Sequence, residues 1–130
     1  MSGRPYIICH MMTSIDGRID CAMTAQLNGV EDYYKTLSLL SSVSLNGRVT
    51  AELEMALKGK FKPKKNEIFG KESFSKKKDS KSLDIIVDTN GTLLWDDDDK
   101  YEKHHLIITS EQVTKEYLEY LDNKNILDCI

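Results

Sequence analysis

The chain has 130 residues, a length that predicts one domain and excludes a multidomain assembly. Hydrophobic residues make up 40% of it and charged residues 30%, a composition that excludes a disordered chain. The formal net charge of −3 argues against a nucleic-acid-binding arm, and no apolar run approaches the ~20 residues of a membrane-spanning helix. Three scattered cysteines, Cys9, Cys21 and Cys129, favour reduced thiols, so we expect a cytoplasmic protein without a membrane partner.

The first part of the chain predicts a strand followed by a helix. Residues 5–12 form a nearly continuous apolar run that is rich in strand-forming residues, which is typical of a central strand buried on both faces. We expect Cys9 and His10 in this strand to be core residues. Apolar residues at helical spacing then predict an amphipathic helix near residues 30–42.

The middle of the chain predicts a strand, a helix and a long loop. A short strand over Val43–Leu45 is followed by Asn46-Gly47, and apolar positions from 49 to 57 mark a second helix. Between Lys58 and Lys81, ten lysines stand against three acidic residues, a net charge of +7. We interpret residues from about 58 to 82 as an exposed basic loop inserted into the domain.

The last third predicts two strands, a helix and the start of another strand. The strands cover residues 83–88 and 106–108, and a further strand begins at 126. Thr109 with Gln112 matches a capping box, which predicts a helix over residues 113–121. The order of these elements predicts an α/β domain with a mostly parallel sheet flanked by helices.

Four consecutive acidic residues, Asp96–Asp99, stand near His104 and His105. Clustered carboxylates suit hard cations, but four in a row point in divergent directions and lack alternate ligand spacing. We therefore interpret this run as a solvated turn and predict no metal site. Trp95, just before it, is expected to pack at a strand edge.

Ligands of parallel sheets bind at the carboxyl ends of the strands. Three loops are expected there, at residues 13–18, 46–50 and 88–91. Thr109-Ser110 is expected at the amino end of a helix, where free amides and the helix dipole favour phosphate.

Motifs at these positions resemble those of a known family. Arg4–Ile8 followed by Thr13–Arg18 resembles the opening of the pyrimidine reductase family of riboflavin biosynthesis, which has a dihydrofolate-reductase-like fold. This family includes the C-terminal reductase domain of the bifunctional deaminase-reductase. Asn46–Thr50 resembles its strand leading into a Gly-x-x-Thr turn, Ile85–Thr89 its strand ending in Val-Asp, and His105–Ser110 its next strand. The order and spacing agree over essentially the whole chain.

The resemblance implies an NADPH-dependent oxidoreductase that reduces the ribose of 5-amino-6-(5-phosphoribosylamino)uracil to a ribitol chain. Carried over by position, the implied cofactor-binding residues are Thr13, Gly47, Arg48, Thr50, Glu54, Thr89 and Ser110. The implied substrate-binding residues are Asp16 and Asn28, and no residue stands out as a catalytic acid. The expected partners are a small-molecule substrate and a second copy of the chain in a homodimer.

The sequence departs from the family pattern at three places. Residues 25–29 lack the family's tryptophan, and Glu54 stands where the family has aspartate. The family's later half, with a glutamate and a glycine-rich loop, is not in this sequence. We therefore expect a fold truncated at its C-terminus, an open sheet edge after Ile130, and little activity from this chain by itself. Two alternatives stay open, a shortened non-catalytic relative and a pteridine- or dihydrofolate-type reductase.

The basic loop keeps a binding module open as a second class of function. Its lysines suit RNA or another polyanion, and one of them suits the extra phosphate of NADPH. However, only Phe61, Phe69 and Phe74 accompany them, so the loop lacks interleaved aromatic side chains that stack on bases. We therefore expect a solvated insertion and no nucleic-acid partner.

Overall fold

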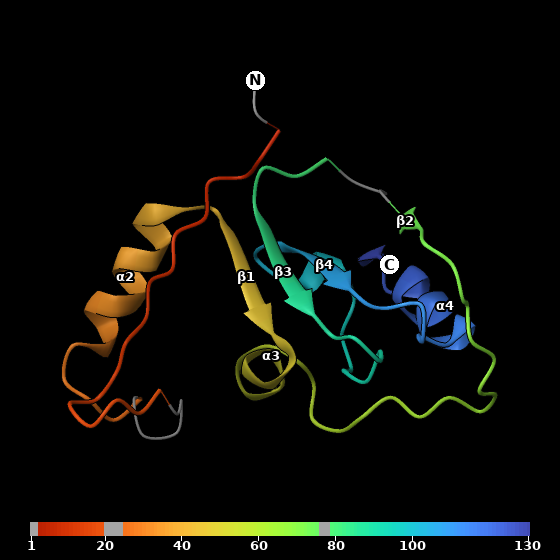
Figure 1. Cartoon of the computed structure of the whole chain (residues 1–130), viewed down its shortest axis with the longest axis horizontal. Coiled ribbons are helices and arrows are strands. Elements are labelled where there is room, and N and C mark those ends of the chain that lie inside the picture. Colours follow the sequence, from red (N-terminus) through yellow and green to blue (C-terminus); the bar gives the residue numbers. More distant parts are fainter. Residues whose placement is uncertain (1–2, 20–24, 76–78) are drawn as a thin grey trace. The chain divides into compact units, whose positions relative to one another are not determined.

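The structure is a computed structural model that describes residues 3–19, 25–75 and 79–130 (Figure 1). The chain divides into two compact units, residues 1–42 and residues 43–130, and each is described by itself. Within the described residues, no helix has the length and apolar character needed to cross a membrane.

The first unit contains helix α2, Val30–Leu40, which confirms the helix predicted near 30–42. The strand predicted at residues 5–12 is wrong, because this segment forms no strand in the structure. Most of its apolar side chains are exposed, with Tyr6 at 92% and Ile7 at 76% of full exposure, and Cys9 is exposed as well. A strand needs hydrogen-bonded neighbours, and strand-forming residues alone do not supply them.

The second unit is built on a five-stranded sheet with the order β1-β3-β4-β5-β2. The four strands β1 (Val43–Gly47), β3 (Leu83–Val87), β4 (His104–Ile108) and β5 (Leu127–Cys129) are parallel neighbours. Figure 1 shows β1, β3 and β4 pointing the same way. The short strand β2 (Phe74–Ser75) pairs with β5 in the antiparallel direction. The mixed α/β class with a mostly parallel sheet is therefore confirmed.

Two helices accompany this sheet, and both differ in their bounds from the prediction. Helix α3 covers Arg48–Glu54, directly after β1, and helix α4 covers Lys115–Asn123. The capping box predicted at Thr109 is wrong, because the N-cap of α4 is Thr114, whose side chain accepts a hydrogen bond from the amide of Tyr117. Ser110 is held instead in a turn that precedes the helix, with its carbonyl accepting the amide of Val113 at 2.9 Å.

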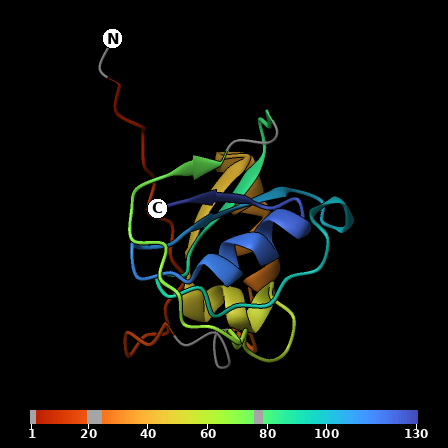
Figure 2. The same cartoon turned by 90° about the vertical axis from the view of Figure 1, so that its right-hand side faces the viewer.

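The core lies on one face of the sheet, under α3, α4 and the loop after β3. Its fully buried side chains are Ala51, Ile86, Leu93, Trp95, Ile107, Val113, Tyr117, Leu121 and Ile126. In Figure 2, α4 and α3 lie in front of the strands. The expectation of Trp95 at a strand edge is wrong, because its ring is fully buried and its Nε1 donates to the hydroxyl of Tyr117 at 3.3 Å. On the opposite face of the sheet, Leu45 is 62% exposed.

The basic segment is attached to the second unit and is not a freely solvated loop. We call residues 57–71 the lysine strap. Its backbone amides donate to neighbouring segments, Phe61 N to Thr92 O at 2.8 Å and Phe69 N to Val113 O at 2.9 Å. The chain then continues into β2, which covers part of the outer edge of β5. The sequence predicts an open sheet edge beside the last strand, but β2 pairs with β5 there, so this edge is partly covered.

The acidic run is also only partly a solvated turn. It contains a short 3-10 helix, η1, over Asp98–Lys100, and Asp98 is fully buried. The carboxylate of Asp98 accepts the backbone amide of His105 at 2.9 Å and lies 2.6 Å from Nδ1 of His104 and 3.2 Å from Nδ1 of His105. Asp98 therefore fixes the start of β4 to the preceding loop.

Burial lowers the pKa of His105, more than the neighbouring carboxylates of Asp98 and Asp84 raise it. An unfolded chain, in which histidine has a pKa of about 6.5, then binds more protons than the folded chain just below that pH. We therefore expect the free energy of unfolding to fall as the pH is lowered from about 7 to about 5. Urea titrations followed by Trp95 fluorescence at several pH values measure this.

His105→Gln is expected to flatten this dependence on pH, because it removes the titrating group. His10→Gln is the matched control, because His10 belongs to the first unit, where it stacks on Tyr33. If the free energy of unfolding of His105→Gln depends on pH as strongly as that of the unsubstituted chain, another titrating group causes the pH dependence.

Candidate functional site

The carboxyl ends of the parallel strands form one edge of the second unit. There Gly47 of β1 is aligned with Val87 of β3, and Val87 with Ile108 of β4. Beyond the strand ends, both the amide and the hydroxyl of Ser110 donate to the carbonyl of Thr89, each at 3.0 Å. Two residues that the sequence predicted as cofactor ligands, Thr89 and Ser110, are thus in direct contact. We call this region the carboxyl edge.

The other residues of this set that lie in the second unit belong to β1 and α3. Gly47 is the N-cap of α3, and a Cβ placed there would have no atom within 4 Å, so the backbone is open to an approaching group. Arg48 and Thr50 follow in the first turn of the helix, and Glu54 is its last residue and is exposed. Gly47, Arg48 and Thr50 therefore adjoin the carboxyl edge, and Glu54 lies one turn further along α3.

The partner of Arg48 is Glu52, which the sequence analysis did not select. The guanidinium Nη1 of Arg48 donates to Oε2 of Glu52 at 2.8 Å, and both side chains are partly exposed. The spacing of four residues along a helix is the signal that identifies such a pair. Because the pair is partly exposed, its contribution to stability is small, and its effect is to orient the guanidinium.

The loop that carries Thr89 is held by a buried carboxylate, that of Asp88. Asp88 is fully buried and accepts the amides of Thr92 at 2.7 Å and Leu93 at 2.9 Å, the hydroxyl of Thr92 at 3.1 Å and the hydroxyl of Tyr117 at 3.2 Å. Burial raises the pKa of Tyr117 far above its ordinary value, so its hydroxyl stays a donor. Asp88 therefore organises the turn beside Thr89 from beneath the surface.

The remaining predicted residues, Thr13, Asp16 and Asn28, belong to the first unit. Asp16 accepts the hydroxyl of Ser14 and pairs with Nε of Arg18 at 3.1 Å, in an exposed turn. Asn28 lines an open pocket of about 340 Å³ together with His10, Met11, Met12, Gly29, Asp32, Tyr33 and Thr36. Asp16 does not line this pocket, so the two predicted substrate residues occupy separate features of the first unit.

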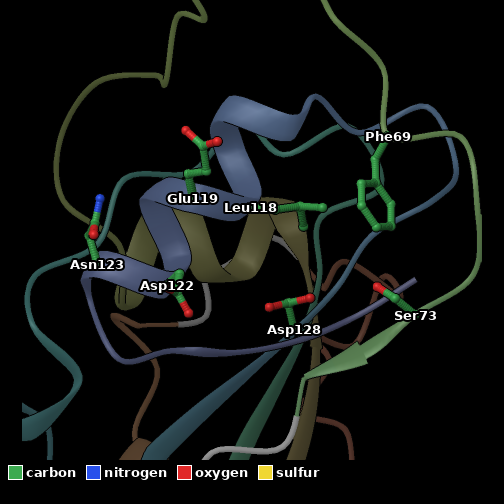
Figure 3. Close-up of a pocket in the computed structure, with 7 residues that line it drawn as sticks. All are labelled: Phe69, Ser73, Leu118, Glu119, Asp122, Asn123 and Asp128. Atoms are coloured by element: carbon green, nitrogen blue, oxygen red, sulfur yellow. The ribbon is translucent and has the colours of Figure 1, made fainter.

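A second pocket, of about 460 Å³, lies between α4, the lysine strap and β5 (Figure 3). It is lined by Phe69, Ser73, Leu118, Glu119, Asp122, Asn123 and Asp128. Figure 3 shows Leu118 and Phe69 extending toward one another across it. Phe69 and Ser73 are more than forty residues before the other lining residues, which all lie within 118–128, so no local sequence signal indicates the pocket. In the described part of the chain, no group of three or more His, Cys, Asp or Glu side chains is arranged to hold a metal ion.

The chemistry of the carboxyl edge suits an anionic ligand. It offers the guanidinium of Arg48, the hydroxyls of Thr50 and Thr89, and the open backbone at Gly47. A cation with neighbouring hydroxyl donors is the donor set that binds phosphate groups. The carboxyl edge therefore carries groups that can bind a phosphate, and the guanidinium among them is paired with Glu52.

Comparison of the chain with protein-family models, with curated proteins and with solved structures finds no match.

Proposed function

We propose that the carboxyl edge is the cofactor site of an NADPH-dependent pyrimidine reductase with a dihydrofolate-reductase-like fold. One observation carries the proposal. The three motifs Asn46–Thr50, Ile85–Thr89 and His105–Ser110, which resemble the reductase family, all end at this one edge of the parallel sheet. Ligands of parallel sheets bind at this end of the strands.

In this proposal NADPH, when bound, supplies the hydride, and the chain supplies binding and orientation. Arg48, oriented by Glu52, neutralises phosphate charge. The hydroxyls of Thr50 and Thr89 donate hydrogen bonds to the cofactor, and Asp88 keeps the loop of Thr89 in its conformation. Ser110 holds Thr89 in place by donating hydrogen bonds to the carbonyl oxygen of Thr89.

The proposed substrate is 5-amino-6-(5-phosphoribosylamino)uracil, whose ribose is reduced to ribitol. The resemblance implies Asp16 and Asn28 as its ligands and Thr13 as a contact of the nicotinamide; all three belong to the first unit, and the proposal for the carboxyl edge does not depend on them. The proposal assigns no general acid. We propose a homodimer as the assembled form.

Arg48→Ala is expected to weaken NADPH binding by roughly tenfold or more, because a charge-assisted hydrogen bond contributes about 1.5–3 kcal/mol. Isothermal titration calorimetry of the intact chain with NADPH measures the change, and NADH in parallel tests the preference for the extra phosphate. Binding that saturates and favours NADPH supports the proposal.

Lys103→Ala is the matched control. Lys103 is also a cation with an acidic neighbour, Asp84, at 3.8 Å. However, Lys103 directly precedes β4 and so lies at the amino ends of the parallel strands, away from the carboxyl edge. The two variants remove the same charge, and only Arg48→Ala is expected to weaken binding. Equal losses in both, or no binding of NADPH by the folded chain at millimolar concentrations, would refute the proposed site.

A further inference from the structure

The lysine strap displays a row of ammonium groups along the second unit. In its central part the half-buried Phe61 and Pro63 alternate with the exposed Lys60, Lys62 and Lys64. This alternation is the pattern of an extended chain, in which residues two apart lie on the same side and about 6.6 Å from one another. The three lysines therefore form a line of positive charge and not a single cluster.

The backbone beneath this line is fixed to the rest of the unit. The ring of Phe61 packs edge-on against that of Tyr117, with 5.0 Å between the ring centroids. The amides of Lys64 and Lys65 both donate to Oε2 of Glu116, at 2.7 and 3.1 Å. A ligand that binds here has to order only the lysine side chains and not the loop, which lowers the entropic cost of binding.

The positive charges of the strap are available to a partner. Five lysines, Lys58, Lys60, Lys62, Lys64 and Lys65, form no ion pair with any residue in the described part of the chain. Three lysines elsewhere in the second unit differ, because Lys100, Lys103 and Lys124 each lie within ion-pair distance of an aspartate. The carboxylate of Glu116, which adjoins the strap, accepts the backbone amides of Lys64 and Lys65.

We propose that the lysine strap binds the phosphate backbone of a single nucleic-acid strand. A line of regularly spaced cations matches a linear polyanion better than it matches a compact anion or a flat membrane. Phe61 and Pro63 are turned inward, so they neither stack on bases nor enter a lipid layer. Binding is therefore electrostatic and independent of base sequence. The net charge of −3 and the lack of interleaved aromatic side chains predict no such partner, and the fixed row of lysines is the observation that favours one.

The test uses the intact chain and a fluorescently labelled single-stranded oligothymidylate, with binding followed by fluorescence anisotropy at several salt concentrations. For four to five phosphate contacts, we expect the logarithm of the association constant to fall with the logarithm of salt with a slope of about −3. Between about 50 and 200 mM salt the affinity then falls on the order of 50-fold.

The decisive variant is the triple substitution Lys60→Gln, Lys62→Gln and Lys64→Gln. Its matched control is Lys100→Gln, Lys103→Gln and Lys124→Gln, which changes the net charge by the same amount at lysines that already have acidic neighbours. We expect the strap variant to lose tenfold or more in affinity and to reduce the salt slope by about 2, and the control to stay within about twofold of the unsubstituted chain.

Equal losses of oligonucleotide affinity in the two variants would overturn the proposal, because binding would then depend on the net charge of the chain and not on the lysine strap. Absence of a salt-dependent complex with the unsubstituted chain would overturn it without any variant. Binding to vesicles that contain phosphatidylserine, without binding to the oligonucleotide, would also overturn it and assign the strap to a membrane surface. Circular dichroism of both variants establishes that they are folded.

Discussion

Gly91→Ala is expected to destabilise the second unit by about 3 kcal/mol or more. Gly91 has φ of +65°, a conformation that costs an L-residue roughly 1–2 kcal/mol. In addition, an added Cβ would lie 2.7 Å from Cγ and 2.8 Å from Cε1 of Tyr117, and closer still to Cδ1. Tyr117 is fully buried in the core, so its ring has no free space to move into, and overpacking costs a further ~1–3 kcal/mol.

Gly70→Ala separates the two costs. Gly70 has a similar φ of +71°, but a Cβ there has no atom within 4 Å. We expect about 1–2 kcal/mol from this variant, which reports the backbone cost alone. The chain has one tryptophan, Trp95, which is buried in the second unit, so its fluorescence during urea unfolding reports this unit. Equal losses of stability in the two variants would contradict the proposed contact with Tyr117.

Asp88→Ala is expected to cost about 3–5 kcal/mol in the free energy of unfolding. The substitution removes the carboxylate that accepts the amides of Thr92 and Leu93 and the hydroxyl of Thr92, whereas the hydroxyl of Tyr117 keeps the carbonyl of Leu93 as an acceptor at 3.0 Å. Each buried donor that loses its acceptor costs about 1–3 kcal/mol. The turn after β3 also loses the group that fixes it, so the proposed cofactor site predicts weaker NADPH binding in the same variant.

Thr92→Val is the control for this prediction. It keeps the size of the side chain and removes only the hydroxyl that donates to Asp88 at 3.1 Å. We expect about 1 kcal/mol from it, measured by urea unfolding as above. If Asp88→Ala costs no more than Thr92→Val, the backbone amides of Thr92 and Leu93 do not depend on the carboxylate.

Most features that depend on neighbours in the chain were predicted correctly from the sequence, the capping box at Thr109 excepted. Apolar spacing predicts α2, and short apolar runs predict β1, β3, β4 and β5 to within a few residues. Turn residues such as Asn46-Gly47 and Asn90-Gly91 mark the strand ends. These signals are local, because a helix or strand periodicity is complete within about ten residues. The alternation of these elements is also sufficient to predict the parallel sheet.

The candidate site was predicted only in part. The positions of Gly47, Thr89 and Ser110 at strand ends follow from the order of the elements. The contacts that hold these residues in place do not follow from that order. Asp88, for example, accepts a hydrogen bond from Tyr117, which belongs to a helix almost thirty residues away. Residues 5–12 show the same limit, since an apolar run becomes a strand only where another strand pairs with it.

By itself, the sequence determined the helices and the parallel strands of the sheet, their order, and the net charge of the basic segment. Only the tertiary structure decided which of those residues are buried and which segments are fixed. Trp95 and Asp98 are buried, and the lysine strap is anchored, because residues distant in the chain supply their contacts. Burial and hydrogen bonding between distant segments are properties of the packed unit, and no local pattern of residues encodes them.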